Sequence, residues 1–220
     1  MLDHVRDPLL HQVRTLYRER DAQLYNNLER GLKSRRIAEA AGIDDSSDTP
    51  FVRSFRGAGR LVAAPAGPRI AVLSVHGWDT HINQGSVDGK LSVLLDELDY
   101  GLGAFKVAAG PAWANTVVTI VTEFGRTVRI NGDEGTDHGI ATVALLAGGA
   151  VNGRRVIADW PGLATSKLYQ ARDLKPTIDL RSLFKGVLRD HLGMPNTIIN
   201  NTVFPDSLNA PSLNGLIKTN

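Results

Sequence analysis

The stretch RIAVLSV, residues 69–75, decides the fold class that this sequence predicts. It is a continuous apolar run of strand length and rich in β-branched residues, which is typical of a strand buried on both faces of a parallel sheet. Three further runs have the same character: NTVVTIVTE at residues 115–123, GIATVALLAGGAV at 139–151 and RRVIAD at 154–159. We therefore expect these four segments to form the centre of the fold.

Helical patterns alternate with the expected strands. One amphipathic helix follows the first run and is defined by Leu91, Leu94, Leu95, Leu98, Leu102 and Phe105. Another begins after Asp179, which is a good N-cap, and ends at Gly193 and Pro195. The alternation predicts an α/β fold with a mostly parallel central sheet and flanking helices.

Helical periodicity also marks the N-terminal part of the chain. Residues 3–42 carry leucines at helical spacing, residues 42–50 are rich in turn and capping residues, and a helix is expected over 51–64. The last 25 residues have no strong period and are expected to wrap the surface. The sequence therefore predicts a helical segment, residues 1–49, ahead of the α/β region.

The composition excludes several classes of protein. The net charge of +2 and the 6% aromatic content give no basis for nucleic-acid binding. The chain has no cysteine, which excludes disulfides and thiolate ligands. No apolar run reaches the roughly 18 residues that a membrane helix needs. The N-terminus is charged throughout and does not match a signal peptide, so these residues predict a cytoplasmic location.

Polar side chains gather directly after two of the expected strands. HGWDTHINQG at residues 76–85 follows the first strand and contains Asp79 and His81. Residues i and i+2 of an extended segment point to the same side, so one cation could bridge these two side chains. Carboxylate oxygen with imidazole nitrogen is a normal ligand mixture for zinc or manganese. The alternative is a hydrogen-bonded turn.

A second cluster begins at the end of the next strand, where sites form in open α/β sheets. Asp137 and His138 are adjacent, and the surrounding glycines permit the irregular backbone that would let both converge on one ion. Glu123 could supply another oxygen, and Arg126 could hold an oxyanion through its planar guanidinium. Alternatively, Glu123 pairs with Arg126, and the Asp-His step is an ordinary turn. Together the two clusters predict a metal or acid–base site.

Four segments in order resemble a bacterial protein family. They are RIAVLSVHGWDTHINQG, TVVTIVTEFGRTVRINGDEGTDHG, LLAGGAVNGRRVIADWPGL and RDLKPTIDLRSLFKGVLRDHLG, which lie within residues 69–193. They resemble the C-terminal half of family DUF1501, in the alkaline-phosphatase-like and sulfatase-like superfamily. The resemblance covers about residues 50–205 and leaves 206–220 as a tail.

This resemblance implies a two-metal site that hydrolyses phosphate or sulfate esters. Asp79 and His81 then look like one set of metal ligands and Asp137 and His138 like another, with Glu123 at a strand-end ligand position. Similar proteins carry a twin-arginine signal, which implies periplasmic export, and a glycine-rich Asn-Asp segment and nucleophile that these 220 residues do not contain. The resemblance therefore implies an incomplete domain.

Three functions follow as expectations. The first is a metal-dependent hydrolase that acts on a small-molecule ester. The second is a non-catalytic relative that keeps a structural ion. The third is a half-domain that needs a partner chain, either a second copy or the missing N-terminal half, because exposed strand edges favour pairing.

Overall fold

The computed structural model describes residues 8–40 and 48–218. The described residues divide into two compact units, one within residues 1–73 together with 101–109 and the other within residues 74–100 together with 110–220. Among the described residues, no helix combines the length and the hydrophobicity that crossing a lipid bilayer requires.

The first unit is helical, as its periodicity predicts. It contains α1 (Pro8–Arg20), α2 (Ala22–Ala40), α3 (Pro50–Ala63) and the last nine residues of α4 (Lys90–Ala109). Arg14 on α1 forms a bidentate ion pair with Glu29 on α2, at 2.6 and 2.7 Å. The predicted loop at 42–50 lies largely outside the described residues.

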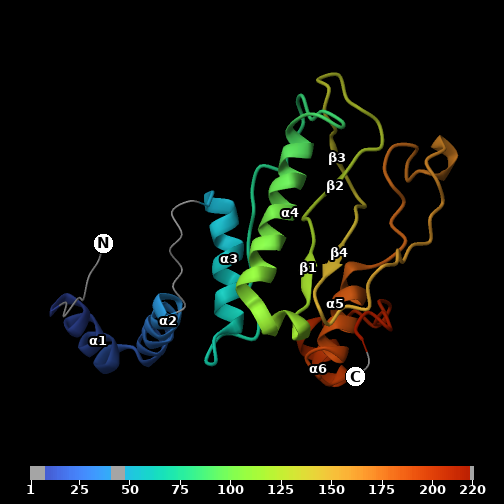
Figure 1. The fold of residues 1–220 in the computed structure, drawn as a ribbon. Coiled ribbons are helices and arrows are strands. Elements are labelled where there is room, and N and C mark those ends of the chain that lie inside the picture. The colour runs from blue at the N-terminus through green and yellow to red at the C-terminus, as the bar shows by residue number, and fades with distance from the viewer. Residues whose placement is uncertain (1–7, 41–47, 219–220) are drawn as a thin grey trace. The chain divides into compact units, whose positions relative to one another are not determined.

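Glycines let α3 and the last nine residues of α4 approach closely, and these two helical segments run side by side in the same direction (Figure 1). A Cβ at Gly59 would lie 2.5 Å from the carbonyl oxygen of Phe105, and one at Gly101 would lie 2.9 Å from the Phe55 ring. Thr49 begins α3, because its side chain accepts a hydrogen bond from the backbone N–H of Val52.

The strands of the second unit form two short antiparallel pairs. The first joins β1 (Val118–Ile120) to β4 (Leu145–Ala147), and the second joins β2 (Gly125–Arg126) to β3 (His138–Gly139). Strands thus occur inside the runs at 115–123 and 139–151, but none is assigned within 69–75 or 154–159. Both described sheets are antiparallel pairs of strands, and the mostly parallel central sheet stays a prediction.

The C-terminal part of the second unit packs around α5 (Leu180–Asp190). Asp179 caps this helix as predicted, accepting from the Arg181 N–H at 2.8 Å. The unit also contains the short helices α6 (Asn196–Ile198), η1 (Gly110–Asn115), η2 (Thr165–Lys167) and η3 (Ile199–Val203). Residues 206–218 join the same unit, with Ala210 and Leu216 buried.

Candidate metal centre

A β-hairpin, residues 125–139, forms one side of the candidate site. Arg126 on β2 stands opposite His138 on β3, and the Thr127 N–H donates to the Asp137 carbonyl at 2.9 Å to continue the pairing. The hairpin therefore fixes the spacing between a guanidinium and an imidazole that are twelve positions apart in the sequence.

A loop of residues 78–84, which we call the ligand loop, lies against the tip of the hairpin. The Asn83 N–H donates to the Asp133 carbonyl at 2.9 Å, and Ile82 and Glu134 form an isolated antiparallel bridge. Gly135 is required here, because any side chain at this position would collide with the carbonyl of His81. The glycine thus permits the close approach of the two segments.

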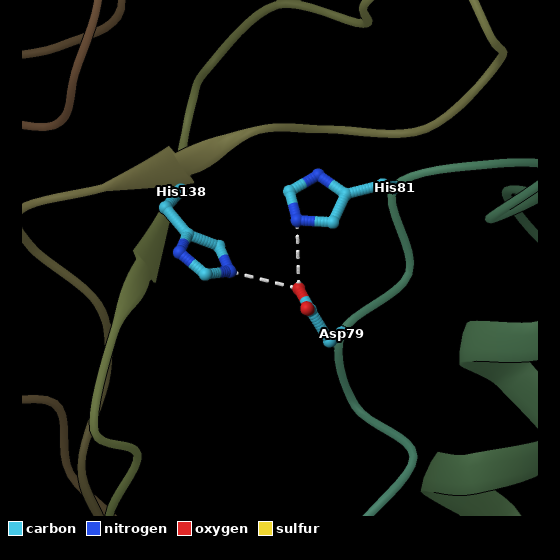
Figure 2. A group of neighbouring side chains, drawn as sticks. All are labelled: Asp79, His81 and His138. Atoms are coloured by element: carbon cyan, nitrogen blue, oxygen red, sulfur yellow. Dashed lines mark hydrogen bonds and ion pairs between the residues drawn. The ribbon is translucent and has the colours of Figure 1, made fainter.

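Three side chains from these two segments meet at one point (Figure 2). The Asp79 Oδ1 atom lies 2.9 Å from His81 Nε2 and 2.8 Å from His138 Nε2. The two imidazole centroids are 4.9 Å apart. Asp79 and His81 point to the same side, as their i and i+2 spacing predicts. Each of the three side chains is about half exposed, so the point where they meet is open to solvent.

The donor set suits a divalent cation. One ligand atom from each of Asp79, His81 and His138 lies within 4.8 Å of the others, and no second such group is found in residues 8–40 and 48–218. Ligand atoms around tetrahedral zinc, at about 2.0 Å from the ion, lie roughly 3.3 Å apart. The two Asp79–His distances are a few tenths of an ångström shorter than this value, and the two imidazole ligand atoms lie within 4.8 Å of each other. Three protein ligands would leave a fourth position open.

The charge of Asp79 is maintained by its neighbours. The hydrogen bond from His138 holds the pKa of the Asp79 carboxyl below its ordinary value, and the charges of His81, His138 and Arg126 act in the same direction. The carboxylate is therefore ionised near neutral pH and available as a ligand.

Arg126 connects the ligand loop to the hairpin. Its guanidinium donates to the carbonyls of Thr136 and Trp78, each at 2.6 Å, and to the Asp79 carboxylate at 3.0 Å. Only 23% of the side chain is exposed. Arg126 thus pairs with Asp79 and supports the carboxylate. The predicted contact with a substrate oxyanion would need guanidinium N–H groups other than those that make these three bonds.

Asp137 lies on the far side of His81. Its Oδ1 atom is 3.6 Å from His81 Nδ1, the ring nitrogen that faces away from Asp79. The Asn131 amide donates to the same carboxylate oxygen at 3.0 Å and to the His81 carbonyl at 3.0 Å. This hydrogen bond from Asn131 lowers the pKa of Asp137. A carboxylate in this place can orient a metal-binding histidine, a role different from the predicted ligand.

Two further residues define the surroundings of His138. Phe124 stacks on its imidazole with centroids 4.3 Å apart and an interplanar angle of 17°, which restrains the ring. Glu123 is exposed and does not belong to the group of converging ligand atoms. Its predicted role at the metal stays a prediction.

The sequence prediction did not assign a role to Gln84, Thr80, Thr136 or Asn131. These polar residues interleave with the predicted ligands in DTHINQ and NGDEGTDH, and this spacing is the signal that could have identified them. What these residues do depends on the hydrogen bonds that they form between the ligand loop and the hairpin.

Comparison with known proteins identifies one family. The model of the family described as "Protein of unknown function (DUF1501)" matches residues 10–203. No curated protein and no solved structure matches the chain. The matched range contains the whole ligand loop and the whole hairpin.

Proposed function

The chain belongs to the DUF1501 family, and from this premise we propose that it is a metal-dependent hydrolase of phosphate or sulfate esters. The observation that carries the proposal is the convergence of Asp79, His81 and His138, whose ligand atoms come within 4.8 Å from two separate segments. The resemblance of four segments to the alkaline-phosphatase-like superfamily supports the reaction class.

In this proposal some residues bind the metal ion and others orient its ligands. Asp79 would supply a negative oxygen, and His81 and His138 would supply Nε2 atoms of neutral imidazoles whose ring proton is on Nδ1. Asp137 contacts the Nδ1 side of the His81 ring and Asn131 donates to the His81 carbonyl, so both restrain this ligand. A bound zinc or manganese ion would polarise an ester oxygen and offset the negative charge that develops during displacement. The exposed setting of the three ligands lets a small anionic ester approach from solvent.

Metal binding and ester hydrolysis together test the proposal. Calorimetric titration with Zn²⁺ and Mn²⁺, followed by turnover of 4-nitrophenyl phosphate and 4-nitrophenyl sulfate, is expected to show binding and activity. Both should be lost in His81→Ala and His138→Ala. The matched control is His11→Ala, since His11 is exposed on α1. Absence of metal binding, or equal turnover in all variants, would refute the proposal.

A second candidate function is that of a subunit that requires a partner chain. Large apolar side chains are exposed in two segments expected to be buried: Val72 is 87% exposed and Val156 is 91% exposed. Apolar surface of this kind favours association with another polypeptide. Sedimentation velocity distinguishes this candidate, because a stable monomer without tendency to associate would contradict it.

The family resemblance also supports a periplasmic location, reached by the twin-arginine route. Fractionation of the native host with an antibody against this chain tests this part of the proposal. Recovery in the cytoplasmic fraction alone would contradict it.

A further inference from the structure

One carboxamide oxygen joins the two segments that carry the metal ligands. The Oε1 atom of Gln84 accepts a hydrogen bond from the Thr80 hydroxyl at 2.9 Å and another from the Thr136 hydroxyl at 2.7 Å. Thr80 belongs to the ligand loop and Thr136 to the hairpin. A carbonyl oxygen has two lone pairs, so two donors saturate it.

The two threonines are close to the ligands in sequence. Thr80 separates Asp79 from His81, and Thr136 lies two residues before His138. Both threonines are buried, with 4% and 8% of their surface exposed. A displacement of either hydroxyl would therefore move the backbone that directs the ligand side chains.

The main chain of Gln84 is itself held on two sides. Its N–H donates to the Glu134 carbonyl at 3.0 Å, and its carbonyl accepts from the N–H of Leu91 in the first turn of α4, also at 3.0 Å. The side chain is half-buried. Gln84 thus starts from a fixed backbone position, which makes its two side-chain bonds effective restraints.

We propose that Gln84 is a positioning residue of the metal centre, which sets the separation of the ligand loop and the hairpin by accepting both threonine hydroxyls. This inference rests on the proposed metal-binding function. It adds a residue whose side-chain hydrogen bonds go to Thr80 and Thr136 and which acts through them. The side chain of Arg126 connects the same segments through two backbone carbonyls and the Asp79 carboxylate, whereas the side chain of Gln84 connects them through two hydroxyls.

Loss of this oxygen has a definite physical consequence. Two buried hydroxyls lose their acceptor, and each must find another partner or remain unsatisfied. The polar residues that support metal ligands typically change metal affinity by about 10- to 100-fold when they are removed. Gln84→Leu is therefore expected to weaken Zn²⁺ binding at least about tenfold. Gln84→Glu keeps an acceptor oxygen in the same place and should retain the affinity.

The experiment uses the full chain and two readouts. Zn²⁺ affinity is measured by competition with a chromophoric chelator, and backbone hydrogen exchange of the metal-free protein is followed by mass spectrometry. Variants are Gln84→Leu, Gln84→Glu and the control Gln23→Leu, whose glutamine is exposed on α2. Gln84→Leu should raise exchange in both residues 78–84 and 131–138, while Gln23→Leu and Gln84→Glu should match the wild type.

The two readouts separate the possible failures. A wild-type chain that binds no Zn²⁺ overturns the metal site and with it the positioning role at that site. If the wild type binds Zn²⁺, affinity equal to that of the wild type in Gln84→Leu overturns the inference. Weaker binding with unchanged exchange in one of the two segments also overturns it, because Gln84 would then not hold them together.

Discussion

Replacing Arg126 with methionine tests whether one guanidinium holds the ligand loop against the hairpin. The side chain donates two bonds of 2.6 Å to backbone carbonyls, one from Trp78 in the loop and one from Thr136 in the hairpin. Methionine fills a similar length but offers no donor. Both carbonyls would lose the guanidinium donor in one substitution, and the Trp78 carbonyl would keep the Thr80 N–H at 3.0 Å.

The expected loss follows from the number and setting of these bonds. Hydrogen bonds from a charged donor contribute about 1.5 to 3 kcal/mol each, and we take the low end because 23% of the Arg126 side chain is exposed. Two such bonds give about 3 kcal/mol. In a chain of this size, that loss should lower the melting temperature by about 6 to 12 °C.

Differential scanning calorimetry of the metal-free chain measures this loss. Arg126→Lys should also destabilise the protein, because a single ammonium cannot reproduce the planar fork that reaches two carbonyls. The control is Arg18→Met, whose arginine is exposed on α1. An Arg126→Met variant that melts within about 2 °C of the wild type would show that the two segments do not depend on the guanidinium.

Three further predictions concern packing, pH and metal removal. Gly59→Ala should lower the melting temperature because its Cβ would lie 2.5 Å from the Phe105 carbonyl oxygen. In the control Gly103→Ala, the added Cβ meets nothing within 4 Å, so the variant should be more stable by up to about 1 kcal/mol through its higher helix propensity. The hydrogen bond from Arg189 lowers the pKa of Asp190 below its ordinary value of 3.8, so its ionised form favours the folded state. The wild type should therefore be more stable than Asp190→Asn at pH 7, and this advantage should disappear as the pH falls through that lowered pKa. Denaturant unfolding at each pH measures the free energy of unfolding of both proteins. A difference between them that does not change with pH would contradict this prediction. Saturation with Zn²⁺ at 100 times its dissociation constant should stabilise the fold by about 2.7 kcal/mol, and chelation should reverse this in a thermal melt; a melting temperature that Zn²⁺ leaves unchanged would contradict this.

Local sequence signals predicted the helices well. The helix expected over 51–64 corresponds to α3, the Asp179 cap to α5 and the leucine spacing of residues 91–105 to α4. These signals succeed because caps and helical periodicity depend on neighbours a few positions away. The strands were less well indicated: the apolar run at 69–75 forms none of the described strands, because strand pairing depends on a partner that an apolar run does not specify.

The sequence by itself determined which candidate metal ligands the chain contains and which two of them point to the same side of their segment. The i and i+2 spacing of Asp79 and His81 was sufficient to predict that both point to one side. Only the tertiary structure decided that His138, 59 positions from Asp79, completes the group and that Asp137 lies behind His81. It also decided that Arg126 donates to two backbone carbonyls and to the Asp79 carboxylate. The physical reason is that these outcomes depend on how the ligand loop docks on the hairpin, a long-range approach that Gly135 permits and that no local pattern encodes.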